Sequence, residues 1–184
     1  QYKCADRGKY LPAAAYSLVE QIKIGTTQKG VFSFCMCPGG YVLSSGTEKD
    51  GIVVNGMSNY ARNSPWSNAA LVVSVKSDRD LKSNDLMAGL KFQHEVEQKA
   101  FALSKKHATG RELPAMTIKE FMEGKLNDKP LPETSSPSGI FKADIRQIFP
   151  DFVNEHLKKG LAEFNKDLPG FVYEEGLLIA PETR

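Results

Sequence analysis

The chain has 184 residues, of which 41% are apolar and 25% charged, and a formal net charge of +2. This composition excludes wholesale disorder, a collagen-like repeat and a disulfide scaffold. No apolar run reaches the roughly 20 residues that cross a bilayer, and the sequence has no basic stripe of the kind that binds duplex nucleic acid. We therefore expect neither a membrane nor a nucleic acid among its partners.

The first half of the chain carries the pattern of short β-strands. Apolar or alternating runs predict strands at 16–23, 31–37, 41–45, 52–55 and 69–75. Asp50-Gly51, between two of these runs, is typical of a tight hairpin with a type I′ turn. The run 69–75 is almost continuously apolar and therefore predicts a central strand. Together these runs indicate an antiparallel sheet of four to five strands.

From about residue 85 the apolar period becomes helical. Thr117 and Glu120 form a capping box for a short helix that Gly124 ends. The other helices are predicted at 86–103, 142–148 and 151–166, and extended segments at 171–173 and 177–179. Strands followed by three to four helices and a closing strand indicate the α+β class.

The domain organisation follows from the segment 125–139, which is rich in Pro, Ser and charge. We interpret it as a surface connector, because too little chain follows it to form a second core. Residues 1–184 would then be a single domain. The sequence begins at Gln1 without a charged and apolar leader and stops soon after the apolar stretch 176–180. We therefore expect a segment of a longer, cytoplasmic protein.

The first candidate site is the run Cys35-Met36-Cys37-Pro38-Gly39-Gly40. On a regular strand the two thiols share a face with Cα atoms about 6.6 Å apart, near the upper limit for a disulfide. A zinc site would need more ligands than the chain offers here, so no metal is predicted. The thiols are either small buried strand residues, groups that face a ligand, or a redox pair. The two glycines either let backbone approach a flat ligand or another chain, or simply make a turn.

The second candidate site is Asn55-Gly56-Met57-Ser58, with Arg62 close behind it. It follows a predicted strand and carries several hydrogen-bond donors. Arg62 is able to hold a carboxylate or phosphate with two hydrogen bonds. The alternative is an ordinary polar loop with a surface arginine.

The third candidate is the pair Gln93 and Glu97 on the longest predicted helix. Both fall near the middle of its apolar arc, one turn apart. A buried carboxylate needs a donor or must keep its proton. The pair either serves the site or ties the helix to sheet backbone. On the last long helix, His156 lies within the apolar arc and is expected to be a core residue.

These motifs resemble a large family of FAD-dependent dehydrogenases whose substrates are uncharacterised. The resemblance rests on the Cys-Met-Cys-Pro-Gly-Gly run, on Asn-Gly-Met-Ser, on Phe149-Pro150 and on Pro169-Gly170-Phe171, and it spans nearly the whole chain. Such flavoproteins carry their nucleotide-binding sheet outside this region. The resemblance therefore implies an inserted, substrate-side domain whose Cys35–Gly40 loop lies against the isoalloxazine ring or the substrate. Met116 departs from the family pattern, where a polar residue is usual.

The resemblance also implies the partners. The parent protein would bind FAD through its remaining FAD-binding domain and act on a small-molecule substrate, whereas this segment alone would neither hold FAD nor turn over. Two other interpretations stay open at this point. One is a non-catalytic binding or self-association module, and the other is a thiol–disulfide protein that uses Cys35 and Cys37.

Overall fold

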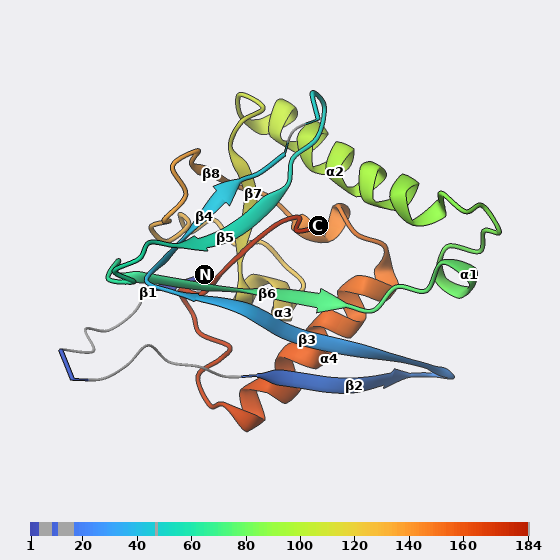
Figure 1. Ribbon diagram of the computed structural model, residues 1–184, viewed down its shortest axis with the longest axis horizontal. Coiled ribbons are helices and arrows are strands. Elements are labelled where there is room, and N and C mark those ends of the chain that lie inside the picture. Colours follow the sequence, from blue (N-terminus) through green and yellow to red (C-terminus); the bar gives the residue numbers. More distant parts are fainter. Residues whose placement is uncertain (4–8, 11–16, 47, 184) are drawn as a thin grey trace.

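The computed structural model describes residues 1–3, 9–10, 17–46 and 48–183, which form an α+β fold (Figure 1). Its strands are β1 (Tyr2–Lys3), β2 (Leu18–Ile24), β3 (Thr27–Pro38), β4 (Gly40–Ser44), β5 (Val54–Ser58), β6 (Trp66–Val73), β7 (Leu113–Thr117), β8 (Ile140–Lys142) and β9 (Leu177–Ile179). Its helices are α1 (Ser77–Asp80), α2 (Ala88–His107), α3 (Ile118–Glu123), α4 (Asp151–Asp167) and the 3₁₀ turn η1 (Ile145–Gln147). The predicted α+β class is confirmed.

The strands form three small sheets, so the predicted antiparallel sheet of four to five strands is confirmed only in part: the largest sheet has four antiparallel strands, but β4 and β5 lie outside it. The largest has the order β1-β6-β3-β2, a second pairs β4 with β5, and the third has the order β8-β7-β9. In the third sheet β7 and β8 run parallel. The division arises because the chain turns sharply at Gly39, between β3 and β4, so that β4 leaves the first sheet. β7, which contains Pro114, was not predicted from the sequence.

The order of the strands confirms that β6 is an interior strand, between β1 and β3. β4 and β5 pair antiparallel, as predicted, from Gly40 opposite Ser58 to Ser44 opposite Val54. The predicted type I′ turn is wrong, however, because Asp50-Gly51 lies inside a longer loop and neither residue has a positive φ. The start of the predicted strand 16–23, at residue 16, lies outside the described residues.

The helices follow the sequence pattern with two exceptions, of which the first is α1, a helix that was not predicted. The capping box is present, since the Glu120 amide donates to Thr117 Oγ1 at 3.1 Å and the Thr117 amide donates to Glu120 Oε2 at 2.9 Å. Gly124 ends α3 with a φ of 75°. The helix predicted at 142–148 is wrong, because Lys142 is the last residue of β8 and the chain then makes only the turn η1. The predicted extended segment 171–173 is not a strand, whereas 177–179 is.

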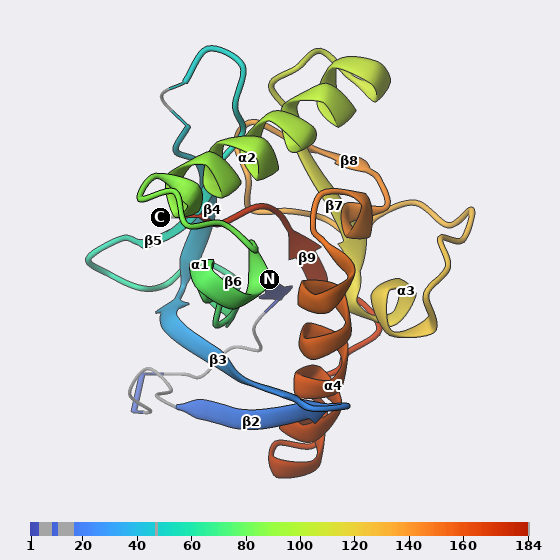
Figure 2. The same cartoon turned by 90° about the vertical axis from the view of Figure 1, so that its right-hand side faces the viewer.

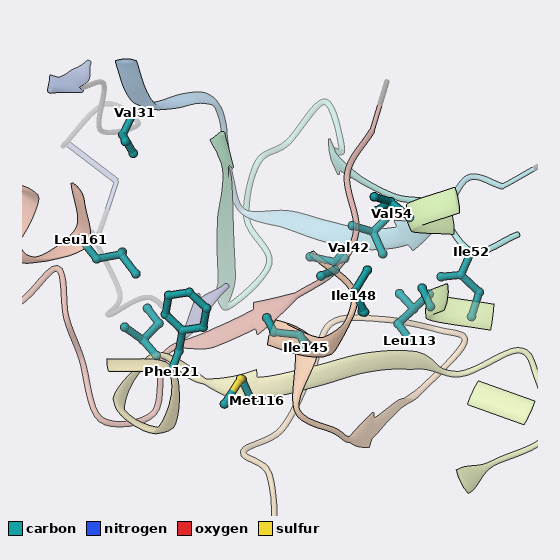
Figure 3. Packing of buried hydrophobic residues seen from close by; sticks show 14 of the residues in the cluster. Val31, Val42, Ile52, Val54, Leu113, Met116, Phe121, Ile145, Ile148 and Leu161 are labelled. Carbon is teal, nitrogen blue, oxygen red and sulfur yellow. The ribbon is translucent and has the colours of Figure 1, made fainter. Parts of the chain in front are cut away.

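The core lies between the sheets and the helices α2 and α4. α4 packs across β2, β3 and β6, and α2 packs on β7 (Figure 2). Figure 3 shows Val31 and Leu161 at one end of the core and Leu113 and Ile52 at the other. His156 is 2% exposed with its Nδ1 2.6 Å from the Phe152 carbonyl oxygen, which confirms it as a core residue.

The segment 125–139 contains no helix or strand and joins α3 to β8. It is partly anchored, because the buried Ser135 hydroxyl accepts a hydrogen bond from the Val42 amide at 3.0 Å and donates one to Gln1 Oε1 at 2.5 Å. No helix in the described part of the chain is long and apolar enough to cross a membrane. Among the same residues, no cluster of three His, Cys, Asp or Glu side chains is placed to hold a metal ion.

Candidate functional site

The structure brings the first two candidate motifs together at the corner between β3 and β4. In the β4–β5 pair, Gly40 stands opposite Ser58 and Tyr41 opposite Met57. The Ser58 hydroxyl donates to the carbonyl oxygen of Pro38 at 3.0 Å. Residues 35–40 and 55–58, separated in the sequence, therefore form one surface at the end of the largest sheet (Figure 1).

Glycine is required at Gly39 and Gly56, as it is at Gly40, where a Cβ atom would lie 2.7 Å from the Cys37 carbonyl oxygen. Gly39 has a φ of 60°, and a side chain there would overlap the backbone of Arg62. A side chain at Gly56 would overlap the amide oxygen of Asn68. Both glycines thus let one segment of this chain pack against another. The close approach of backbone that the glycines allow is therefore made to other segments of this chain. Contact of these residues with a ligand stays a prediction.

The two thiols occupy different environments because β3 is irregular between them. Its register with β6 shifts between Phe34 and Cys37, and Cys35 adopts a φ of 51°. Cys35 is exposed, whereas Cys37 is half-buried, with its Sγ donating to the Cys35 carbonyl oxygen at 3.5 Å. Burial raises the pKa of the Cys37 thiol, and a hydrogen bond with Ser58 opposes this effect only in part. Both are free thiols.

A cavity of about 990 Å³ opens beside this corner. Its wall runs from β3 and β6 to the start of α2, the face of α4 and the C-terminal segment 177–183. Of the candidate residues, four line it: Cys35, Asn55, Gly56 and Gln93. The others stand outside its lining: Met36, Cys37, Pro38, Gly39, Gly40, Met57, Ser58, Arg62 and Glu97. The cavity therefore reaches only one edge of the two motifs.

Gln93 and Glu97 hold the C-terminal segment against α2. The Gln93 amide donates to the Thr183 carbonyl oxygen at 2.5 Å, and the Thr183 hydroxyl donates to Glu97 Oε1 at 2.6 Å. The Glu97 backbone also accepts from the Ile52 amide at 3.2 Å. One of the two alternatives from the sequence was that this pair ties the helix to sheet backbone. The pair does tie the helix to another segment, but that segment is 180–183 and not a strand of a sheet. We name these contacts of Gln93 and Glu97 with Thr183 the C-terminal clasp.

Two residues of the cavity wall escaped the sequence analysis. Asn68 is 6% exposed, and its Nδ2 has no hydrogen-bond partner within the described structure. Glu182 is half-buried beside the cavity, and burial raises the pKa of its carboxyl group. A polar residue directly before the apolar run 69–75 was the available signal for Asn68. The sequence carries no signal for Glu182, because only the fold brings residue 182 close to residue 37.

Comparison with known proteins gives two findings. A model of the family described as "FAD-dependent protein, C-terminal domain-like" matches residues 1–184. A protein of Clostridium beijerinckii described as "Uncharacterized protein" is 36% identical over 176 residues, which is 95% of this chain. The match covers 32% of that protein, so the chain spans about a third of the length of this relative.

Proposed function

This chain belongs to the family of FAD-dependent protein C-terminal domain-like segments, and from that premise we propose that it is the substrate-side domain of a longer FAD-dependent oxidoreductase. In this role it covers the flavin held by the remaining FAD-binding domain and encloses the substrate. The observation that carries the proposal is the large apolar cavity that opens at the corner of the two glycine-containing motifs. Sites for small molecules are usually concave and apolar with few polar groups.

The lining of the cavity suits part of FAD and not the rest. The apolar wall, which includes the exposed Cys35, would fit the edge of a flat, uncharged ring. No Lys, Arg or His occurs among the described lining residues, so nothing there would hold a diphosphate. This division fits a domain that meets the ring or the substrate while other polypeptide binds the phosphates.

When bound, FAD would supply hydride or electron transfer. The described residues would then bind and orient the substrate and exclude water. The C-terminal clasp fixes the segment that carries Glu182 along the cavity wall. The cysteine side of the corner, at Cys35, would face the ring.

Two further features support a place within a larger protein. The backbone of Gln1 exchanges hydrogen bonds with Leu177, at 2.6 and 2.9 Å, so the first residue lies near the last described ones. Ends that lie close together are common in domains, and they are compatible with insertion into a longer chain. Large apolar side chains are also exposed around the corner, with Phe34 at 46%, Met57 at 59% and Tyr60 fully exposed. A surface of this kind is typical of one that another domain covers.

The proposal is tested by the distance from Cys35 to the flavin in the full-length protein. With Cys4→Ser and Cys37→Ser in place, Cys35 is labelled with a nitroxide, and its dipolar coupling to the photoreduced flavin semiquinone is measured by pulsed electron paramagnetic resonance. We expect a strong coupling. In the control, Cys35→Ser and Thr26→Cys move the label to the turn just before β3, about 30 Å away, and the coupling falls. A coupling from Cys35 no stronger than from residue 26 would contradict the proposal.

A further inference from the structure

The cavity has the chemistry of a site for an uncharged molecule. Its walls come from the apolar residues of β6, α4 and β9, such as Leu71, Leu161 and Leu178. Glu182 is the one charged side chain among the described residues that line it. An anion placed here would meet no cation and would lose its hydration, which costs several kcal/mol.

Asn68 supplies a polar group at one point of this apolar wall. It stands opposite Cys37 in the β3–β6 pair, and its amide lies over Gly56. Its side chain is almost completely buried, and Nδ2 has no partner among the residues that the structure describes. An unsatisfied buried donor costs about 1–3 kcal/mol. An oxygen acceptor on a bound molecule would remove that cost.

The rim of the cavity is apolar as well. Val75 and Leu90 belong to the lining and are 38% and 57% exposed. Gly89, next to Leu90 on α2, also belongs to the lining, and a Cβ atom there would meet nothing within 4 Å. The rim at this exposed position is apolar, so an apolar molecule would contact it without losing hydrogen bonds to water.

We propose that the cavity binds a largely apolar, uncharged substrate with a carbonyl-type oxygen, and that Asn68 Nδ2 donates a hydrogen bond to this oxygen. The proposal rests on the proposed function, because it names the substrate class of the same site. The ligand oxygen satisfies the buried amide, and the rest of the molecule fills the apolar space between β6 and α4. Asn68 is then a specificity-determining residue.

The test uses the full-length protein and Prodan, a neutral naphthalene dye with a single ketone. Its binding is measured by equilibrium dialysis, beside an analogue in which a propyl group replaces the ketone chain and one in which a carboxylate replaces it. We expect Asn68→Leu to weaken Prodan binding about five- to tenfold, the effect of one buried hydrogen bond. The ketone-free analogue should bind Asn68→Leu at least as well as the wild type. Asn84→Leu, outside the cavity lining, should change neither.

A second pair of variants locates the dye without touching Asn68. Gly89→Trp should place a large side chain at the rim of the cavity and weaken Prodan binding, whereas Gly89→Ala adds one methyl group in open space and should leave it unchanged. In the wild type, the carboxylate analogue should bind at least about tenfold more weakly than Prodan, because the cavity offers it no cation. This comparison tests the assignment to uncharged substrates even if Asn68→Leu does not fold.

Several results would overturn the proposal. If Asn68→Leu weakened the binding of Prodan and of the ketone-free analogue equally, the proposed hydrogen bond from Asn68 would be wrong. If the wild type bound the carboxylate analogue more tightly than Prodan, the assignment to uncharged substrates would be wrong. If Prodan bound only to the protein without FAD, the flavin ring itself would occupy the space beside Asn68. None of these results depends on the coupling between Cys35 and the flavin, so failure of the substrate class and failure of the proposed function are distinguishable.

Discussion

At the scale of single residues, the backbone between Phe34 and Cys37 decides how the two thiols differ. A regular strand would have given them one face and similar exposure. The register shift and the positive φ of Cys35 instead leave Cys35 in solvent and Cys37 half-buried. Because reactivity follows the thiolate fraction and access, the two cysteines are not equivalent.

We therefore predict selective modification of Cys35. Iodoacetamide at neutral pH should alkylate Cys35 well before Cys37, because Cys37 is less accessible and burial raises its thiol pKa. Peptide mass spectrometry over a time course measures both rates. The alkylation rate of Cys37 should keep increasing to a higher pH than that of an ordinary thiol, because its pKa is raised. Equal rates in the folded protein would contradict this, and denatured protein, in which both thiols are exposed, serves as the control.

At the scale of elements, an ion pair fastens the short helix α1 to the first sheet. Lys29 on β3 and Asp80 on α1 form a salt bridge in which both side chains are largely buried. The Lys29 ammonium also donates to the Ser74 carbonyl oxygen at 3.2 Å and lies 4.8 Å from the Phe152 ring centre, on α4. The pair therefore connects β3, α1 and α4 at the end of the cavity where Leu81 and Val75 lie.

This ion pair predicts a loss of stability in acid. Burial alone would raise the pKa of Asp80, but hydrogen bonds from Lys29 and from the Lys76 amide hold it below its ordinary value. A carboxyl whose pKa is lower in the folded state stabilises above its unfolded pKa, and this contribution disappears as the pH falls through the folded one. Asp80→Asn should cost about 3 kcal/mol at neutral pH, and the difference from the wild type should shrink in acid.

Urea unfolding at neutral pH and at about pH 3, below the ordinary Asp pKa, measures this difference. Asp78→Asn is the matched control on the same helix, because Asp78 is exposed and its pairing with Arg79, at 3.9 Å, contributes little. If the two variants had the same stability at neutral pH, the buried pair would not stabilise α1.

At the scale of the whole molecule, the C-terminal segment joins parts that are far apart in the sequence. Its residue Pro181 accepts a hydrogen bond from the Val54 amide at 2.8 Å, and Ala180 donates to Pro114 at 3.2 Å. The C-terminal clasp then holds Thr183 on α2. The segment therefore connects β5, β7 and α2, and most of its residues line the cavity.

Removing the Thr183 hydroxyl should loosen this closure. Thr183→Val deletes the donor to the buried Glu97 carboxylate, with an expected cost of about 1–3 kcal/mol. Hydrogen exchange of the Val54 amide, which is bonded to the same segment, should accelerate. Thr183→Ser keeps the hydroxyl and is the control, with exchange close to that of the wild type. Unchanged exchange in Thr183→Val would mean that the clasp does not hold the segment.

Local sequence patterns determined those elements whose side chains carry their own signal. Thr117, Glu120 and Gly124 predicted both ends of α3, because a capping box and a left-handed glycine act over a few residues. The apolar periods predicted α2, α4 and β9, and the position of Glu97 on its helix predicted its burial. The motif at Cys35–Gly40 and its partner at Asn55–Ser58 also pointed to this family, which the matched family model bears out.

Only the tertiary structure decided the rest, because it depends on contacts between distant segments. β8 (Ile140–Lys142), which the sequence did not predict, is a strand because it pairs with β7. Gln93 and Glu97 contact Thr183, about ninety positions away, and Asn68 meets Gly56 across strands. Periodicity shows which face of an element is apolar and not what that face will meet, so the three sheets, the cavity and its buried amide follow only from the packed chain.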